Sequence, residues 1–291
     1  MQPRTVSAII RPFAASAGPL TYYQPLPSRS VEYLDPFLLL HHHGPHQFPP
    51  NNAGLPFGPH PHRGFETVTF IYDGDVLHRD STGYESTIQA GGIQWMTAGA
   101  GLVHSENVSP EKRRDGGRFE IIQLWINLPA RLKMHEPAYQ GFQRADIPTV
   151  TLDGGRVAVD VVAGTWGDTR GAARRGPAHS LTGIQASTLT LAPGGTVTFA
   201  VPESRTILLY QLHGDTLIND TAVSDRAQVL FNRDGVDVTI TAQTASRLLL
   251  CTGEPLGEPV VSHGPFVMNT EAEIRQAMRD YGAGRMGVLT E

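Results

Sequence analysis

The chain has a single cysteine, no long apolar run and no basic block, and each of these shortages excludes something. The one cysteine, Cys251, rules out an intrachain disulfide and fits a reducing compartment. No stretch approaches the ~18 apolar residues of a membrane span. The early apolar run at residues 6–10 is shorter than the roughly 7–15-residue core of a signal peptide. We therefore expect a cytoplasmic protein with no membrane partner.

The balance of charge argues against nucleic acid as a direct partner. The 23 Lys and Arg residues are outnumbered by 28 Asp and Glu residues, which gives a formal net charge of -5. The short basic run at residues 112–114 is followed at once by Asp115. Because binding to phosphates requires a clustered positive surface, we expect no direct contact with nucleic acid.

Short apolar runs separated by turn residues indicate an all-β chain. The sequence holds 31 glycines and 22 prolines, spread along its length. From Gly64 to Leu128, runs rich in β-branched and aromatic residues end at Asp-Gly, Gly-Gly or similar turns. Turns at this spacing are typical of a sandwich or a Greek-key barrel. At 291 residues the chain is long enough for two domains with full cores.

A weak internal repeat indicates two copies of one fold. Residues 70–77 resemble residues 210–217, and both segments read as a strand, a Gly-Asp turn and a second strand. The offset of 140 residues (210 minus 70) is close to half the chain. It places Ala200 and Pro202 where the first copy has His60 and His62. We therefore expect one metal site, in the first copy only.

We divide the chain into a first β-domain at residues 1–135, a linker at 136–146 and a second β-domain at 147–291. The second domain is expected to end with a helix near residues 271–281. Thr270 provides an N-cap, and acidic residues follow in the first helical turn. The apolar face of this helix is expected to consist of Ile274, Ala277, Met278 and Tyr281.

Two short motifs predict a metal site. His60 and His62 form one pair separated by a single residue, and His104 and Glu106 form another. On a β-strand, residues two apart project from the same face. Two such pairs on neighbouring strands would place four side chains about 5 Å apart across the strands and roughly 6.6 Å apart along them. Three imidazoles and one carboxylate can then converge on a single ion.

Other residues compete for this role. Glu66 lies four residues after His62 and would face the same way on a regular strand, so we place it beside the metal as an acceptor rather than as a ligand. The histidines at 41–43 and 46 look like a metal-binding tract, but we interpret them as the edge of a loop that covers residues 44–61. His78 is expected to be a hydrogen-bonded core histidine.

Several motifs resemble the pirin family of bicupins. They are HPHRGFETVT at residues 60–69, HRDS at 78–81, MTAGAGLVHSE at 96–106, QLWINLP at 123–129 and the tail GPFVMNT at 264–270. The resemblance implies two tandem cupin (Greek-key/jelly-roll) β-barrels, with the metal held in the N-terminal barrel by His60, His62, His104 and Glu106. As in pirins, Gly99 stands where the second cupin motif usually has proline. The histidines at 41–43 stand where the pirin pattern has an acidic residue nearby.

The family also implies an activity. Its members are described as quercetinases, which open a flavonol ring with O₂. By that analogy the protein is a quercetin 2,3-dioxygenase-like oxidoreductase, and its partners are O₂ and a flavonol-like aromatic substrate. Three imidazoles and a carboxylate suit Fe(II), which we expect, and also Mn, Ni, Cu or Zn. Glu106 would be the catalytic base that takes the proton of the substrate hydroxyl.

Two alternatives stay open at this point. The resemblance to pirins also allows a non-enzymatic regulatory role. In that role the protein would contact a transcription factor or a metabolic enzyme according to the redox state of its metal. A third interpretation is a cupin isomerase or lyase that uses the metal without oxygen. The fold alone does not decide among these functions.

Overall fold

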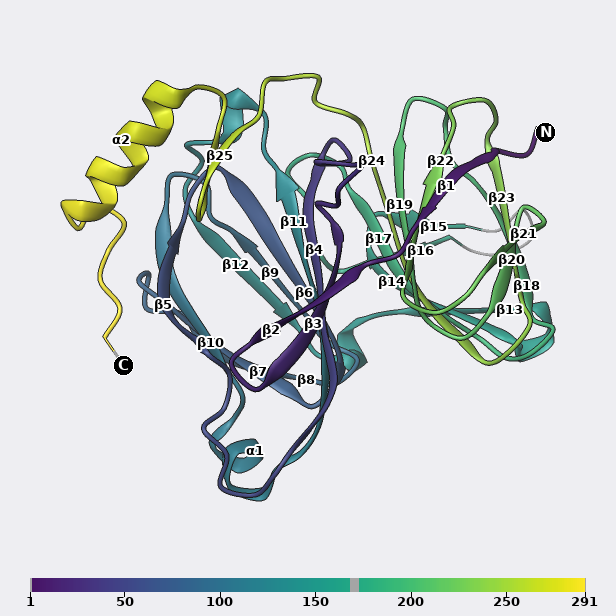
Figure 1. The fold of residues 1–291 in the computed structure, drawn as a ribbon, viewed down its shortest axis with the longest axis horizontal. Helices are drawn as coiled ribbons and strands as arrows, with labels where there is room; N and C mark the ends of the chain where they lie inside the picture. The colour runs from purple at the N-terminus through teal and green to yellow at the C-terminus, as the bar shows by residue number, and fades with distance from the viewer. Residues whose placement is uncertain (1, 168–172, 291) are drawn as a thin grey trace. The chain divides into compact units, whose positions relative to one another are not determined.

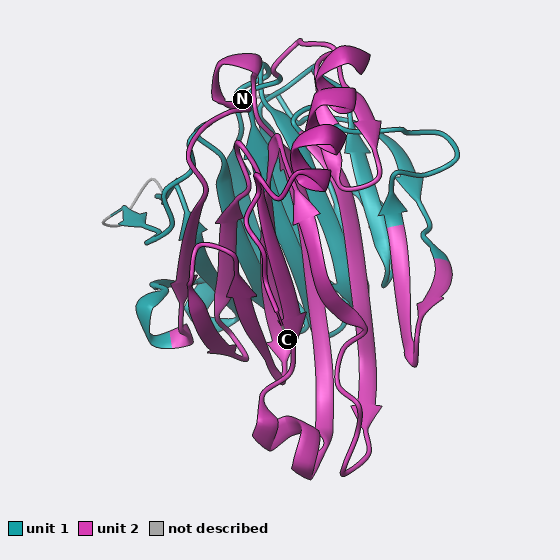
Figure 2. Ribbon diagram, turned by 90° about the vertical axis from the view of Figure 1, so that its left-hand side faces the viewer, with its two compact units in different colours: residues 1–13, 25–36, 145–255 teal, residues 14–24, 37–144, 256–291 magenta. Residues whose placement is uncertain are grey.

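The computed structural model describes residues 2–167 and 173–290, which form two compact units (Figure 2). Unit 1 consists of residues 1–13, 25–36 and 145–255, and unit 2 consists of residues 14–24, 37–144 and 256–291. The units are therefore assembled from interleaved segments, whereas the sequence led us to expect continuous domains at 1–135 and 147–291. The difference has two causes. Residues 1–13 and 25–36 belong to the same unit as residues 145–255, and residues 256–291 belong to the same unit as residues 37–144.

Unit 2 is built from two antiparallel sheets. The larger sheet has the order β12-β9-β6-β11-β4-β3-β2, and the smaller one has the order β5-β10-β7-β8 (Figure 1). The strands of the larger sheet are β2 (Phe13–Ala17), β3 (Leu20–Leu26), β4 (Phe37–Phe48), β6 (Phe65–Asp73), β9 (Ile93–Thr97), β11 (Gly117–Asn127) and β12 (Ala138–Phe142). Those of the smaller sheet are β5 (Phe57–His62), β7 (Asp75–Asp80), β8 (Glu85–Gln89) and β10 (Leu102–Asn107). The hairpin of β25 (Val261–His263) and β26 (Phe266–Met268) belongs to this unit as well.

Unit 1 repeats this arrangement. Its larger sheet has the order β1-β22-β19-β24-β17-β14-β13, and its smaller sheet has the order β18-β23-β20-β21. The strands are β1 (Val6–Ile10), β13 (Thr149–Leu152), β14 (Val157–Ala163), β17 (Gln185–Leu191), β18 (Thr196–Ala200), β19 (Thr206–His213), β20 (Thr216–Ile218), β21 (Thr221–Val223), β22 (Ala227–Phe231), β23 (Asp237–Ala242) and β24 (Ser246–Gly253). A small hairpin joins β15 (Thr165–Trp166) and β16 (Arg174–Arg175). Position by position, the two strand orders are the same, so the predicted fold class of two tandem cupin barrels is confirmed.

Each barrel has its own apolar core, because the strands alternate between inward apolar and outward polar side chains. The core of unit 1 is a large cluster of Val, Leu and Ile residues that includes Leu189, Leu248 and Ile240. Unit 2 has a smaller cluster around Phe119, Ile71 and Val76. The inner wall of unit 2 is correspondingly more polar, and this polar region holds the histidines.

The described residues contain two α-helices, α1 (Pro110–Asp115) and α2 (Glu271–Gly282). The predicted C-terminal helix is therefore confirmed, and the Thr270 hydroxyl accepts a hydrogen bond from the amide of Glu273 (3.3 Å). Ile274 and Ala277 are buried as expected. Met278 and Tyr281 are exposed, so the apolar face is narrower than predicted. Neither helix is long and apolar enough to cross a membrane.

The segment that we assigned to a loop contains two strands. The histidines at 41–43 lie within β4, which continues to Phe48 and pairs with β11. β5 then begins at Phe57. Proline suggested a loop here, yet β5 contains Pro59 and Pro61 because it is the edge strand of its sheet, where a missing N–H breaks no ladder hydrogen bond.

Candidate metal centre

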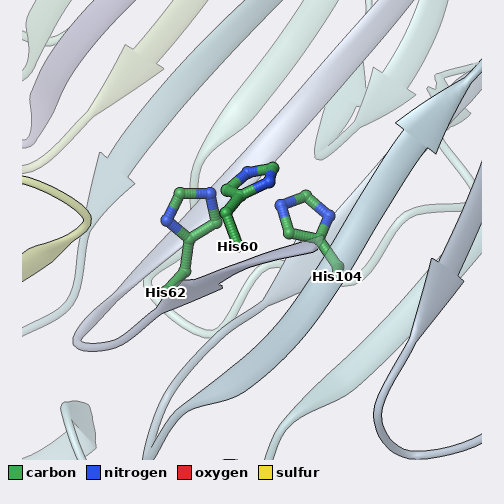
Figure 3. A group of neighbouring side chains, drawn as sticks. All are labelled: His60, His62 and His104. Carbon is green, nitrogen blue, oxygen red and sulfur yellow. The ribbon is translucent and has the colours of Figure 1, made fainter. Parts of the chain in front are cut away.

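Three histidine side chains converge between β5 and β10. These strands are antiparallel neighbours, with His104 directly opposite His60 and Leu102 opposite His62. The three rings lie beside one another (Figure 3), with centroid distances of 4.4 Å for His60–His104, 4.8 Å for His60–His62 and 4.9 Å for His62–His104. One ligand nitrogen from each lies within 4.8 Å of the other two. His104 therefore meets the pair His60 and His62 across the two strands, while the full set of four ligands stays a prediction.

The buried imidazoles are neutral, which metal binding requires. Burial, reinforced by the neighbouring His60, lowers the pKa of His62 to about 3. Burial also lowers the pKa of His104 well below its ordinary value, and the two other histidines of the group lower it further. A neutral imidazole offers a lone pair to a cation, whereas a protonated one repels it.

His104 indicates most directly that the group fits a metal ion. Both of its ring nitrogens are buried and have no hydrogen-bond partner among the described residues. A buried polar atom without a partner costs roughly 1–3 kcal/mol, so unpaired nitrogens of this kind are rare unless something binds them. The donor set, three imidazoles beside a carboxylate, is one that divalent transition metals prefer.

Backbone carbonyls orient the other two rings. The Nδ1 of His60 lies 2.8 Å from the carbonyl oxygen of Gly58, and the Nδ1 of His62 lies 3.4 Å from that of Pro265. A carbonyl oxygen can only accept, so in each ring Nδ1 carries the proton and Nε2 keeps its lone pair. A metal-ligating histidine is commonly held in this way by its second nitrogen.

Glu106 is buried next to the histidine group and is held by two donors. Its Oε2 accepts from the side-chain amide of Gln123 (2.8 Å), and its Oε1 accepts from the hydroxyl of Thr69 (3.3 Å). The pairing of β10 with β5 shifts register between His104 and Glu106. Glu106 therefore stands somewhat apart from the three histidines, but it lines the same cavity as His60. Its role as a fourth ligand remains a prediction.

This cavity has a volume of about 180 Å³. Besides His60 and Glu106, its walls consist of Ala17, Tyr22, His41, His43, Phe57, Ile121 and Gln123. The lining is thus largely aromatic and apolar, with carboxylate, amide and imidazole groups at a few positions. Such a combination is typical of a small-molecule site.

The sequence analysis missed the contribution of β4 to this cavity. Alternation along β4 places His41 and His43 on the cavity side and His42 on the other side, where its Nε2 lies 2.9 Å from Glu120. Burial lowers the pKa of His41 to about 4 and that of His43 to about 3. The Nδ1 of His43 is buried and has no partner among the described residues. Strand alternation within the histidine run was the signal that could have revealed this wall.

Glu66 faces away from the metal centre, which differs from our expectation. Thr69 of the same strand donates to Glu106, so the odd-numbered side chains of β6 face the centre and the even-numbered ones face the opposite way. Glu66 accepts instead from the hydroxyl of Thr97 on β9 (2.7 Å). The expectation that Glu66 faces the same way as His62 was wrong because Gly64, with φ +90°, interrupts the alternation of side chains between them. Only glycine fits at this position, since a Cβ would lie 1.9 Å from the carbonyl oxygen of Val267.

His78 lies next to the centre in the role that the sequence suggested. Its Nε2 is 3.0 Å from the carboxylate of Asp80, and both side chains are buried. Its ring stacks on Tyr139 with a centroid distance of 4.3 Å and lies 5.4 Å from the ring of His104. His78 is therefore a hydrogen-bonded histidine that packs behind the three-histidine group.

The corresponding positions of unit 1 carry no ligand side chains. The strands β7 and β20 correspond, because each follows the Gly-Asp turn of its unit. Glu106 is opposite His78 on β7, and Ile240 is opposite Ile218 on β20, so Ile240 is the counterpart of Glu106. Extending this register across the paired strands gives the full correspondence, which is Phe199 for His60, Val201 for His62, Val238 for His104 and Ile240 for Glu106. The offset of 140 residues thus misplaced β18 by one residue and β23 by several, because the turns between the strands differ in length.

Comparisons with known proteins match the whole architecture. The pirin family model matches residues 20–126, and the model of the pirin C-terminal cupin domain matches residues 186–287. Pirin-1 of Arabidopsis thaliana is 42% identical over 262 residues, which cover 87% of this chain and 84% of that protein. A pirin-like protein of Caulobacter vibrioides is 42% identical over 260 residues, 88% of each chain. The crystal structure of a quercetin 2,3-dioxygenase from Acinetobacter baumannii has a TM-score of 0.92 and 38% identity, and covers 99% of this chain and 100% of that one.

Proposed function

This chain belongs to the pirin family, and from that premise we propose that it is a metal-dependent dioxygenase that opens the ring of a flavonol-like substrate with O₂. In this proposal His60, His62, His104 and Glu106 hold one divalent transition metal, with Fe(II) as the expected ion. The observation that carries it is the convergence of three imidazoles, one of them with both nitrogens buried and unpaired among the described residues, beside a cavity with aromatic walls. The similarity to a structure named as a quercetin 2,3-dioxygenase supports the choice of reaction.

The residues of the cavity would bind and orient the substrate. A bound divalent metal would supply Lewis acidity toward a substrate hydroxyl and the redox chemistry that O₂ requires. Tyr22, Phe57 and Ile121 present apolar surface to a flat ring and exclude water. The volume of about 180 Å³ lies below the ~300 Å³ at which drug-sized pockets begin, so only the hydroxyl-bearing ring of a flavonol would enter.

Glu106 would hold the proton that the substrate gives up. Its two oxygens already accept from Gln123 and Thr69, which fixes the plane of the carboxylate and leaves the remaining lone pairs for a substrate hydroxyl. A positioned general base of this kind contributes typically 10²–10⁴-fold to a rate. Gln123 and Thr69 would therefore act as positioning residues.

The neutral His43 would give the substrate a hydrogen-bonding partner on the wall formed by β4. His43 lines the same cavity as Glu106, and its buried Nδ1 has no partner among the described residues. His41 is less available, because its Nε2 already lies 2.8 Å from the side-chain oxygen of Gln24. A flavonol carries hydroxyl and carbonyl oxygens at several positions, and an unsatisfied buried nitrogen would select among them.

The test is oxygen uptake. The protein is stripped of metal, reconstituted anaerobically with Fe(II) and mixed with quercetin and O₂ in an oxygen electrode. We expect uptake that depends on the metal and disappears in His104→Ala, whereas the matched control His263→Ala, which changes an exposed histidine, keeps it. Absence of uptake with Fe(II), Mn, Ni, Cu and Zn in turn would remove the proposal and leave the non-enzymatic regulatory role or an isomerase or lyase that works without oxygen.

A further inference from the structure

The second barrel contains a cavity of its own. Its volume is about 340 Å³, which falls at the lower end of the range for small-molecule sites. Within its own barrel this cavity occupies the end that corresponds to the candidate metal centre of unit 2, because its lining includes Phe199 and Val201, the counterparts of His60 and His62. At the positions that correspond to His60 and His62, unit 1 therefore has apolar side chains beside a cavity.

The hollow exists because inward side chains become smaller or polar at one end of the barrel. On β17, Leu191 and Leu189 are core residues, but the next inward position is Ser187. On β24, the inward series continues from Leu248 through Leu250 to a threonine. Apolar side chains fill one half of the barrel, and the half lined by Ser187 stays open.

An aromatic corner forms one wall of the cavity. The rings of Trp166 on β15 and Phe199 on β18 contact each other with a centroid distance of 5.3 Å and an interplanar angle of 52°. Val201 and Leu250 supply further apolar surface. A tilted pair of rings beside aliphatic walls offers a flat aromatic molecule both stacking and edge contacts.

The polar groups of the lining disfavour an anionic ligand. Asp237 is the only ionisable side chain among the described lining residues, and its negative charge disfavours carboxylates and phosphates. Ser187 is buried, and its hydroxyl makes no hydrogen bond with any side chain in the part of the chain that the structure describes. A hydroxyl on the ligand could both donate to it and accept from it.

We propose that unit 1 is a second binding site, which takes an uncharged, flat aromatic alcohol with its ring against Trp166 and Phe199 and its hydroxyl at Ser187. This site is independent of the metal and of the dioxygenase activity. It needs no group that unit 2 provides.

The experiment uses the full-length protein labelled with 5-fluorotryptophan and 2-naphthol as the probe. The three tryptophans, Trp95, Trp125 and Trp166, give separate ¹⁹F signals, and Trp166→Phe assigns the relevant one. We expect 2-naphthol to shift the signal of Trp166 saturably, equally in metal-loaded and metal-free protein. A shift confined to Trp125, which lies against His62 in the metal barrel, would overturn the proposal, as would no shift up to the solubility limit of the probe.

Variants separate this cavity from the metal centre. Ser187→Leu should fill the cavity and weaken binding at least about tenfold, while Ser187→Ala should weaken it roughly fivefold through the lost hydrogen bond. His62→Ala is the matched control in the other barrel and should bind 2-naphthol as the unchanged protein does. Thermal unfolding verifies that each variant is folded, and Ser187→Ala decides alone if the larger residue prevents folding. Unchanged affinity in the serine variants, or equal affinity for 2-naphthoate or tetramethylammonium, would contradict the proposal.

Discussion

His104 couples folding to metal binding. Its two buried, unpaired ring nitrogens each cost roughly 1–3 kcal/mol in the absence of a partner. A metal ion that coordinates one of them removes that cost and binds the folded state selectively, since the unfolded chain does not bring β5 and β10 together. A ligand at 100 times its Kd stabilises a protein by about 2.7 kcal/mol. The metal should therefore raise the melting temperature as well as enable chemistry.

Glu106 can be tested without disturbing the barrel. Glu106→Gln keeps the shape of the side chain and removes its capacity as a base. We expect kcat/KM for quercetin to fall about 100-fold or more, while circular dichroism stays unchanged. Steady-state oxygen uptake at matched metal content measures the effect, with the exposed Glu136→Gln as the control. Full activity in Glu106→Gln would show that the proton goes elsewhere.

The buried carboxyl of Glu66 should make the free energy of unfolding depend on pH. Burial raises the pKa of its carboxyl to about 7 from 4.5, although the hydrogen bond from Thr97 opposes the shift. Between about pH 4.5 and pH 7, the carboxyl is therefore protonated in the folded state and ionised in the unfolded state. The free energy of unfolding falls as the pH rises through this window. Below about pH 4.5 both states are protonated, and above about pH 7 the loss is complete.

Glu66→Gln should remove this penalty. A glutamine is neutral at every pH. We therefore expect the free energy of unfolding of the variant, relative to that of the unchanged protein, to be about 2 kcal/mol higher at pH 8 than at pH 5. Urea unfolding of the metal-free proteins at the two pH values provides the measurement. A stability difference that is the same at both pH values would mean that Glu66 is ionised in the folded state.

At this scale the sequence pointed to the proposed ligands because the spacing of each pair is a local signal. A spacing of two on a strand places His60 beside His62 and His104 beside Glu106 on one face, whatever lies between the pairs. The same reasoning failed for Glu66, because the left-handed turn at Gly64 resets the alternation. It was not applied to His43, because the prolines that follow the histidine run suggested a loop rather than a strand.

At the scale of elements, α2 holds the end of the ligand-bearing strand β5. Arg63 directly follows His62 in the chain. Its Nη1 donates a hydrogen bond to the carboxylate of Asp280 on α2 at 2.8 Å. The Nε of Arg63 donates to the carbonyl oxygen of Ala100 at 2.6 Å, and the backbone of Arg63 pairs with that of Val267 and Pro265. A C-terminal helix and hairpin thus fix the position of His62 from more than 200 residues away in the sequence.

Asp280→Asn should loosen this anchor. The variant leaves the buried guanidinium of Arg63 without its countercharge, so His62 loses part of its support. We expect metal affinity to fall about tenfold, as is usual when a group that orients a ligand is changed. Competition with a fluorescent chelator measures the Kd. The control is Glu271→Gln, an exposed acid of the same helix; equal losses in both variants would reduce the effect to general destabilisation.

Elements with local signals were predictable, and elements defined by partners were not. The helix α2 was visible because Thr270 and Glu273 form a capping box, in which the amide of Asn269 also donates to the carboxylate of Glu273 (3.1 Å). By contrast, β5 contains two prolines and is a strand only because it is paired on one side, with β10. No local pattern in residues 57–62 reveals that pairing.

At the scale of the whole molecule, the interleaved units predict that the first domain expected from sequence is not a folding unit. A fragment of residues 1–146 lacks Val267 and Asp280, so buried Arg63 and Lys133 would each lose partners. We expect this fragment to show poor dispersion in its amide NMR spectrum and no cooperative unfolding. A folded fragment that binds metal with the affinity of the full chain would refute this.

Adding residues 256–291 as a separate peptide provides the control. Because the peptide supplies Asp280 and the hairpin of β25 and β26, we expect it to restore part of the amide dispersion and of the metal binding. A peptide in which Asp280 is replaced by Asn should restore less. Equal effects of the two peptides would locate the missing stability in the apolar contacts of Phe266 and Ile274 instead.

The interleaving also sets an order of events at the ribosome. Every residue of unit 1 has been synthesised once residue 255 is added, but unit 2 waits for residues 256–291. At about 5–20 residues per second, those 36 residues take a few seconds longer. Unit 1, whose main segment is residues 145–255, is thus complete first, and we expect the nascent unit 2 to depend on chaperones during that interval.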